Sequence, residues 1–266
     1  PAQANTLRTL QILSALGDTL YKANKDGSLT PSLAKDLPKV SQDSLLIDIP
    51  LRENISFHDG SSFNAKAMKF SLSRFMKIGT LNYLLNDKIE DIKVKDEFLL
   101  RIKLKTPSSS IKRLLTSVNL TPVSPNSYSN YKDKFNSKSF IGTGPYFLES
   151  FNSNQQIIKP FDNYWGEKPL NKGIDFINYI NSSTLFGAIK TKEVDVLISN
   201  SIDDMQRVAL NKMVNKGKLN SGEGDPTEIG FITFKANTLP LKNKNIREAL
   251  SYTIDRELIS KQVSFG

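Results

Sequence analysis

Residues 142–146 read Gly-Thr-Gly-Pro-Tyr, and the pattern of the chain changes at this motif. The glycines supply turn geometry, and the ring of Pro145 fixes φ where a strand can begin. After the motif we expect longer strands over 145–151, 155–160 and 174–180. The motif therefore predicts the entry of the chain into a sheet.

Downstream of these strands, helical and strand patterns alternate. We expect helices over 182–190 and 201–213, and strands over 194–198 and 227–235. The last element is predicted to be one amphipathic helix over 245–263, because its apolar residues follow helical spacing. This alternation predicts an α/β fold.

Upstream of the motif, the sequence predicts a helix and a pair of strands. Asn64 is expected to cap a helix that runs to about Lys77. Residues 89–95 and 98–104 alternate apolar and polar side chains on either side of a polar turn, which predicts a strand pair. The remaining expected elements are helices over 7–22, 31–36 and 108–117 and a strand over 45–52.

Composition excludes several classes of site. The 266 residues include no cysteine, which excludes disulfides, thiolate nucleophiles and Cys-ligated metals. His58 is the only histidine, which excludes a multi-histidine metal site. It precedes Asp59-Gly60 in a predicted turn, and we expect a solvated side chain there. No catalytic residue, metal ligand or cofactor is predicted, although a hydrolase built around His58 is kept as an alternative.

The formal charge of +9 allows two interpretations. A basic chain can bind nucleic acid or another anionic surface. Alternatively, lysines are spread over solvated faces without a common ligand. They occur singly or in pairs, with no block of five, which favours the second interpretation. We therefore expect no nucleic-acid partner and keep a basic nucleic-acid-binding module as the alternative. No run of about 18 apolar residues is present.

Seven short segments form a recognisable series along the chain. They are 26–34 (DGSLTPSLA), 51–60 (LRENISFHDG), 70–74 (FSLSR), 142–146 (GTGPY), 163–169 (NYWGEKP), 193–195 (EVD) and 246–256 (IREALSYTIDR). In this order they resemble the family 5 extracellular solute-binding proteins of ABC importers, the oligopeptide, dipeptide and nickel class. Trp165, inside the fifth segment, is expected to fill an apolar site while its N–H finds a partner.

The resemblance implies a periplasmic-binding-protein type II-like fold. Residues 1–40 with 147–238 would form the main mixed-sheet lobe, and 41–146 a smaller inserted α+β lobe. Residues 239–266 would begin a third lobe that closes on the ligand. Because family members are usually nearly twice as long, we expect a fragment that lacks an opening strand, most of the third lobe and any leader.

The implied function is capture of oligopeptides in a cleft between lobes and delivery to the permease subunits of an ABC transporter. Hinge closure around the ligand would select the form that engages the transporter. The implied location is periplasmic or extracytoplasmic, peripheral to the membrane, and a lipid anchor on the full-length protein is compatible with it. No enzyme activity is expected.

The sequence departs from the family pattern at three places. Lys66-Ala67 stand where relatives carry an acid, Lys192 replaces a glycine, and 231–235 lack the asparagine that relatives often carry. The resemblance implies that this last position faces the binding region, so its change leaves the ligand class open. Carriers of nickel chelates, oligosaccharides or opines therefore stay as alternatives.

By position in the family pattern, eight residues are the ligand-binding candidates. They are Arg8, Thr9, Gln11, Thr143, Ser199, Asn200, Gly230 and Thr233. Five of them also have a plainer interpretation: Thr9 and Gln11 as residues of a helix surface, Ser199 and Asn200 as caps of the next helix, and Thr143 as part of a structural turn.

Overall fold

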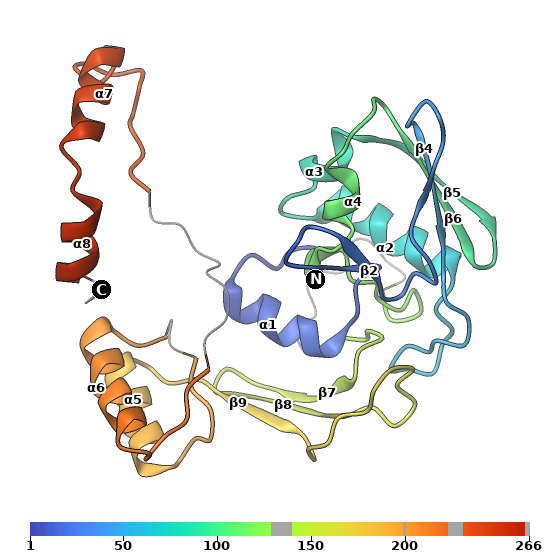
Figure 1. Ribbon diagram of the computed structural model, residues 1–266. Coiled ribbons are helices and arrows are strands. Elements are labelled where there is room, and N and C mark those ends of the chain that lie inside the picture. The colour runs from blue at the N-terminus through green and yellow to red at the C-terminus, as the bar shows by residue number, and fades with distance from the viewer. Residues whose placement is uncertain (129–139, 199–200, 223–230, 264–266) are drawn as a thin grey trace. The chain divides into compact units, whose positions relative to one another are not determined.

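The computed structural model describes residues 1–128, 140–198, 201–222 and 231–263, apart from the side chains of Leu7, Arg8 and Val263 (Figure 1). The chain divides into two compact units, Pro1–Asn178 and Tyr179–Gly266. Every pairing between the described strands is antiparallel.

The larger sheet of the first unit has four strands in the order β3-β4-β6-β5. Their bounds are β3 Lys39–Val40, β4 Leu46–Pro50, β5 Ile89–Asp96 and β6 Leu99–Leu104. Side chains alternate across this sheet, so that Ile47, Ile49, Leu100, Ile102 and Leu104 are buried on one face. The strands expected over 45–52, 89–95 and 98–104 are thus confirmed.

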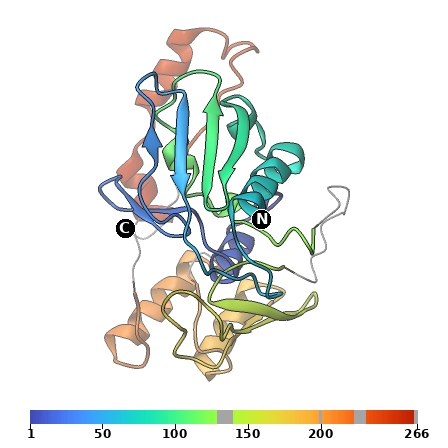
Figure 2. The ribbon, with the colours of Figure 1, turned by 90° about the vertical axis from the view of Figure 1, so that its right-hand side faces the viewer.

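Helix α2 (Ala65–Ile78) covers the apolar face of this sheet (Figure 2). Met68, Leu72 and Phe75 recur at helical spacing and are buried in the same core as the strands. The Asn64 side chain accepts hydrogen bonds from the backbone N–H groups of residues 66 and 67, both at 3.1 Å. The predicted cap of this helix is confirmed.

A second sheet orders β7-β8-β9, with bounds β7 Tyr146–Phe151, β8 Gln155–Pro160 and β9 Ile174–Ile177. Helix α1 (Leu7–Leu16) packs near it (Figure 1), and Leu13, Leu16 and Ile158 share one buried cluster. The expected strands after the glycine motif are present, although β9 ends three residues earlier than predicted.

Two expected helices near the N-terminus are corrected. Helix α1 stops at Leu16, not at residue 22, because the extended backbone of Gly17 turns the chain away. The chain then forms β1 (Tyr21–Ala23), which pairs with β2 (Leu29–Pro31). Residues 31–36 form no helix, because their amide groups bond to other segments: those of Ser32 and Ala34 donate to the carbonyl of Leu20.

Three short helical turns complete the first unit. They are α3 (Tyr83–Asn86), α4 (Ile111–Leu114) and the 3-10 turn η1 (Val118–Leu120). The helix expected over 108–117 is therefore only one turn long. The amides of Thr116 and Ser117 donate three residues back, to Arg113 and Leu114, so the backbone tightens instead of continuing as an α-helix.

The second unit contains helices α5 (Ser182–Thr191), α6 (Asp204–Asn215), α7 (Lys244–Tyr252) and α8 (Arg256–Val263). The single helix expected over 245–263 is broken, because Asp255 accepts a 2.8 Å bond from the amide of Leu258 and starts α8. Among the described residues, no helix is both long and apolar enough to span a membrane.

The strand expected over 194–198 is absent, and so is the described part, 231–235, of the strand expected over 227–235. Val196 and Phe231 expose most of their side chains. A strand needs a neighbour to receive its backbone hydrogen bonds. The described part of this unit provides no neighbouring strand. The two segments therefore do not form strands, although their residue types favour β-structure.

Candidate functional site

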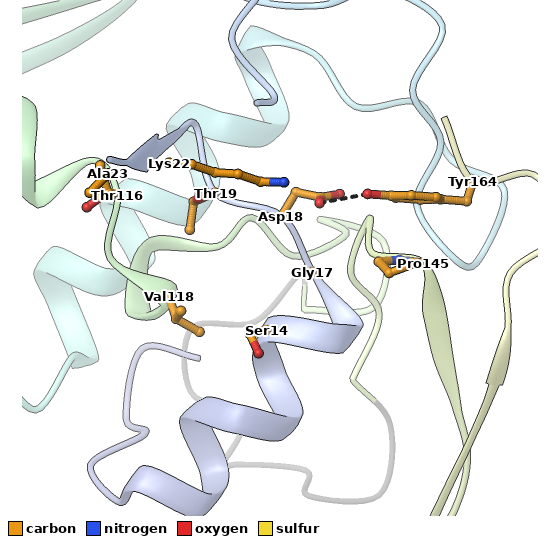
Figure 3. A pocket seen from close by; sticks show the side chains of 10 residues that line it. All are labelled: Ser14, Gly17, Asp18, Thr19, Lys22, Ala23, Thr116, Val118, Pro145 and Tyr164. Carbon is orange, nitrogen blue, oxygen red and sulfur yellow. Dashed lines mark hydrogen bonds between the residues drawn. The ribbon is translucent and has the colours of Figure 1, made fainter. Parts of the chain in front are cut away.

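A cavity of about 360 Å3 lies at the C-terminal end of α1 (Figure 3). Its walls come from α1, the residues that join α1 to β1, β1 itself, the 116–118 segment, the glycine motif of residues 142–146 and the tryptophan segment. The lining residues are Ser14, Gly17, Asp18, Thr19, Lys22, Ala23, Thr116, Val118, Pro145 and Tyr164. All of them belong to the first unit.

Close backbone approach at two glycines shapes this region. The amide of Gly144 donates to the carbonyl of Leu16 at 3.1 Å. A Cβ atom at Gly144 would lie 2.4 Å from the backbone nitrogen of Gly17 and from the carbonyl carbon of Leu16. Neither backbone atom can yield as a flexible side chain would, so this crossing of the two segments requires glycine.

Asp18 is the buried centre of a hydrogen-bond network beside the cavity. Its Oδ1 accepts from the hydroxyl of Tyr164 at 3.1 Å (Figure 3). Its Oδ2 accepts from Nε1–H of Trp165 at 2.9 Å and from the hydroxyl of Thr143 at 3.2 Å. Burial raises the pKa of Asp18, and this effect exceeds the opposing effect of the three donors. The predicted partner for the Trp165 N–H is thus present.

The cavity offers a cation and several hydroxyl groups to a ligand. The ammonium group of Lys22 points along the cavity toward Asp18 (Figure 3). Ser14 and Thr19 donate their hydroxyl protons to the backbone carbonyls of Gln11 and Tyr21, both at 2.7 Å, and keep lone pairs that can accept. Because three protein donors already occupy Asp18, Lys22 is the group best placed to receive a ligand charge.

No metal centre accompanies this cavity in the described part of the chain. Within those residues, no group of three or more histidine, cysteine, aspartate or glutamate side chains could hold a metal ion.

The predicted site residues of the first unit lie outside the lining of this cavity. Thr9 lies in the first turn of α1, where its amide donates to the Thr6 hydroxyl at 3.3 Å, and Gln11 lies on the same helix. Of Arg8 the structure describes the backbone in α1 only. Thr143 is fully buried and bonds to Asp18. Neither Thr9, Gln11 nor Thr143 lines the cavity.

The candidates of the second unit are described only in part. Thr233 is exposed and lies outside any helix or strand. Ser199, Asn200 and Gly230 lie outside the described residues.

Sequence reasoning missed Asp18, Lys22 and Tyr164. The helix predicted over 7–22 included Asp18 and Lys22, so neither was considered as a residue of the chain beyond a helix end. Gly17 is the signal that could have corrected this, because glycine directly after an apolar helical run is a common helix end.

The expectation for His58 is wrong. Its side chain is partly buried, not solvated, and Nε2 lies 3.0 Å from the carbonyl oxygen of Gly144. Its Nδ1 accepts a 3.3 Å bond from the amide of Gly142. The ring of Phe161 stands edge-on to the imidazole with centroids 5.0 Å apart. Burial lowers the pKa of His58.

The family model of bacterial extracellular solute-binding proteins, family 5 Middle, matches residues 28–266. The chain belongs to this family. In this family 5 chain, the glycine motif and the tryptophan segment meet at Asp18. The recognition made from the seven segments is confirmed.

Two relatives illustrate the range of family 5 proteins. The glutathione-binding protein GsiB of Salmonella typhimurium is 27% identical over 270 residues, which cover the whole chain and 51% of GsiB. The nickel-binding periplasmic protein of Escherichia coli is 26% identical over 95% of the chain and 49% of the relative. The chain thus spans about half the length of these relatives.

Solved structures confirm the fold class. NikA from Brucella suis, in complex with Fe(III)-EDTA, superposes with a TM-score of 0.87 at 21% identity, over the whole chain and 54% of NikA. DppA from Helicobacter pylori, in complex with the peptide STSA, gives 0.77 at 20% identity over the whole chain and 56% of DppA. The chain has the α/β fold of these periplasmic binding proteins.

Proposed function

We propose that this chain is part of an extracytoplasmic solute-binding component of an ABC importer, which captures peptide-type solutes and delivers them to the permease. The family supports the transport role. The cavity at the end of α1 supports the solute class, because Lys22 suits a carboxylate and the Ser14 and Thr19 oxygens suit donors of a peptide. This combination is the observation that carries the proposal.

The solute would bind between the predicted lobes, and the lobes would close on it by a hinge motion. The predicted residues keep distinct roles in this proposal. Arg8, Thr9 and Gln11 stay ligand-binding candidates on α1, and Ser199, Asn200, Gly230 and Thr233 stay candidates within the second unit. Thr143 acts only through Asp18, since its side chain is buried.

The location follows from the same role. A solute-binding component works outside the cytoplasm, peripheral to the membrane that holds its permease. The basic charge gives little support to nucleic-acid binding, since three cations of the exposed sheet face are already paired with carboxylates. These pairs are Arg101–Asp48, Lys103–Glu90 and Lys93–Asp91. Paired charges do not form the contiguous basic face that nucleic acid requires.

The test is a ligand comparison on the protein expressed from its complete reading frame. Thermal unfolding would be followed with di- to pentapeptides, glutathione, a nickel–histidine chelate, Fe(III)-EDTA and an opine, each at the same concentration. A peptide at 100 times its Kd should stabilise the protein by about 2.7 kcal/mol. A shift with a chelate or opine and none with peptides or glutathione would overturn the proposed solute class.

A matched pair of variants tests the cavity. Lys22→Ala should weaken peptide binding at least tenfold, because it removes the ammonium group beside the cavity. Lys66→Ala removes an exposed lysine from the first turn of α2 and should leave affinity unchanged. Equal affinities of both variants would show that the cavity is not part of the binding site, whichever solute binds.

A further inference from the structure

The backbone of residues 142–144 is held from two sides. On one side, Gly144 N–H donates to the carbonyl of Leu16 at the end of α1 at 3.1 Å. On the other side, the His58 amide donates to the carbonyl of Gly142 at 2.9 Å, and both ring nitrogens of His58 reach the same segment. His58 therefore joins the 51–60 segment to the glycine motif, 84 to 86 residues further along the chain.

The partners of the imidazole define its protonation state. The amide of Gly142 can only donate, so Nδ1 must carry a lone pair to accept its hydrogen. The carbonyl of Gly144 can only accept, so Nε2 must carry the proton. One neutral tautomer satisfies both bonds. The doubly protonated ring would instead point an N–H at the N–H of Gly142.

The surroundings of the ring oppose a positive charge. Phe161 and Phe147 flank it edge-on, with centroids 5.0 and 6.5 Å away. Burial is the largest influence on the pKa of His58 and lowers it, while the backbone of Gly144 and of Phe140 and the charge of Asp59 act in the opposite direction. Asp59 is the charged group that acts on His58 in the described part of the chain.

The Asp59 carboxylate is itself committed to other donors. It accepts from the hydroxyls of Ser61 and Ser124 at 2.5 Å and from that of Ser127 at 3.3 Å. Burial acts to raise the pKa of Asp59, but these hydrogen bonds together outweigh burial and lower it. Because its pKa lies below 3.8, Asp59 is ionised at pH 5 and above and contributes no titration between pH 6.5 and 5.

We propose that His58 is an acid-sensitive clasp, which fixes the 142–144 segment while the imidazole is neutral and releases the Gly142 amide when the ring gains a proton. The protonated Nδ1 loses the Gly142 N–H as a partner and turns to the carbonyl of Phe140, whose influence favours the charged ring. The released segment is the one that carries Thr143 to Asp18. Acid thus loosens the crossing of α1 with the glycine motif.

The sign of the pH dependence follows from the lowered pKa. An unfolded chain protonates His58 near pH 6.5, whereas the folded chain does so only at lower pH. The clasp therefore contributes its full stability above pH 6.5. As the pH falls below 6.5 the unfolded state binds the proton first, and stability declines until the lower folded pKa is reached.

The direct test uses the fact that the chain has a single histidine. One imidazole resonance should titrate in the NMR spectrum with a pKa below 6.5, and its nitrogen shifts should report the Nε2–H tautomer at neutral pH. Hydrogen exchange at the Gly142 amide should rise at least tenfold beyond the intrinsic pH effect over the same titration. A pKa at or above 6.5, or a Gly142 amide that does not respond, overturns the clasp.

Variants separate His58 from the other acid-titrating groups. His58→Gln should reduce the loss of unfolding free energy between pH 6.5 and 5, while the contributions of Asp18 and of the Pro1 amino group, whose pKa burial lowers to about 5, are retained. His58→Phe keeps a flat ring without the hydrogen bonds and should behave in the same way. An unchanged pH dependence in the variants contradicts the proposal, and the wild-type titration decides alone if neither variant folds.

Discussion

Trp165 Nε1–H donates to Oδ2 of Asp18 across 2.9 Å, and the two residues stand 147 positions apart in the chain. The hydroxyl of Thr143 reaches the same oxygen, so two family motifs of the sequence meet on one buried carboxylate. A buried carboxylate is costly without donors, and buried donors are costly without an acceptor. Each motif therefore depends on Asp18 for its place in the fold.

Removing this carboxylate should destabilise the first unit strongly. Asp18→Ala leaves the Trp165 N–H and the hydroxyls of Thr143 and Tyr164 without their acceptor, and we expect a loss of about 3–5 kcal/mol. Urea unfolding followed by the emission of Trp165, the only tryptophan of the chain, measures it.

Asp18→Asn is the matched control, since it keeps the shape and one acceptor oxygen but turns a donor toward its neighbours. It should fall between the wild type and Asp18→Ala. A loss below about 1 kcal/mol for Asp18→Ala, the ordinary value of one hydrogen bond, would contradict a central role for this network.

The crossing of α1 with the glycine motif should tolerate no side chain. Gly144→Ala places a methyl group 2.4 Å from backbone atoms of residues 16 and 17, and we expect about 1–3 kcal/mol of destabilisation in the same urea assay. Gly187→Ala is the opposite case. Gly187 lies inside α5, and apart from its chain neighbours and the backbone of its own helix no atom is found within 4 Å of the position that an alanine methyl group would take. This substitution should add about 0.5–1 kcal/mol of helix stability.

Circular dichroism at 222 nm reports on α5 in the Gly187→Ala variant. Equal effects of the two alanine substitutions would show that close packing does not govern the glycine motif.

Local patterns predicted much of the first unit. The alternation in β4, β5 and β6 and the Asn64 cap of α2 are local signals, and each appears in the structure where it was expected. These elements bury their apolar faces against one another, so local preference and packing agree. At the break between α7 and α8 the local signals disagreed. Apolar spacing alone predicted one continuous helix, but the side chain of Asp255 accepts a backbone hydrogen bond and begins a new helix.

The candidate site was less accessible to sequence reasoning. Asp18, Lys22 and Tyr164 meet only because Gly17 ends α1 and the chain returns 125 or more residues later. Hydrophobic periodicity reports on local structure only, so it cannot predict contacts between residues this far apart in the chain. His58 was misjudged for the same reason, because a turn residue with a small polar neighbour reads as solvated until the glycine motif is folded onto it.

The cap of α2 offers a local test of the first core. Asn64→Ala removes the acceptor for the amides of residues 66 and 67 and should cost about 1 kcal/mol of unfolding free energy. Asn64→Asp keeps the acceptor and adds a negative charge to a first turn that has no acidic residue, so it should match or exceed the wild type. Destabilisation by both substitutions to the same extent would show that shape, rather than capping, matters at this position.

The ion pair on the exposed face of the larger sheet should depend on pH. Arg101 binds Asp48 through two bonds of 2.6 Å, from Nε and Nη2, and these bonds lower the pKa of Asp48 below its usual value of 3.8. The pair therefore contributes stability above pH 3.8, and this contribution is lost as the pH falls through the lower folded pKa.

A double-mutant cycle with Asp48→Asn and Arg101→Gln should give a coupling free energy of about 1 kcal/mol at pH 7. This value is near the upper end for exposed pairs, because the geometry is bidentate and both side chains are largely covered. The coupling should decrease in about 1 M salt, where charges are screened over a few ångströms, and vanish near pH 2. Lys103 and Glu90, more exposed and joined by one bond of 2.8 Å, supply the comparison and should couple more weakly. A larger coupling for that second pair would contradict the importance of the two-bond geometry.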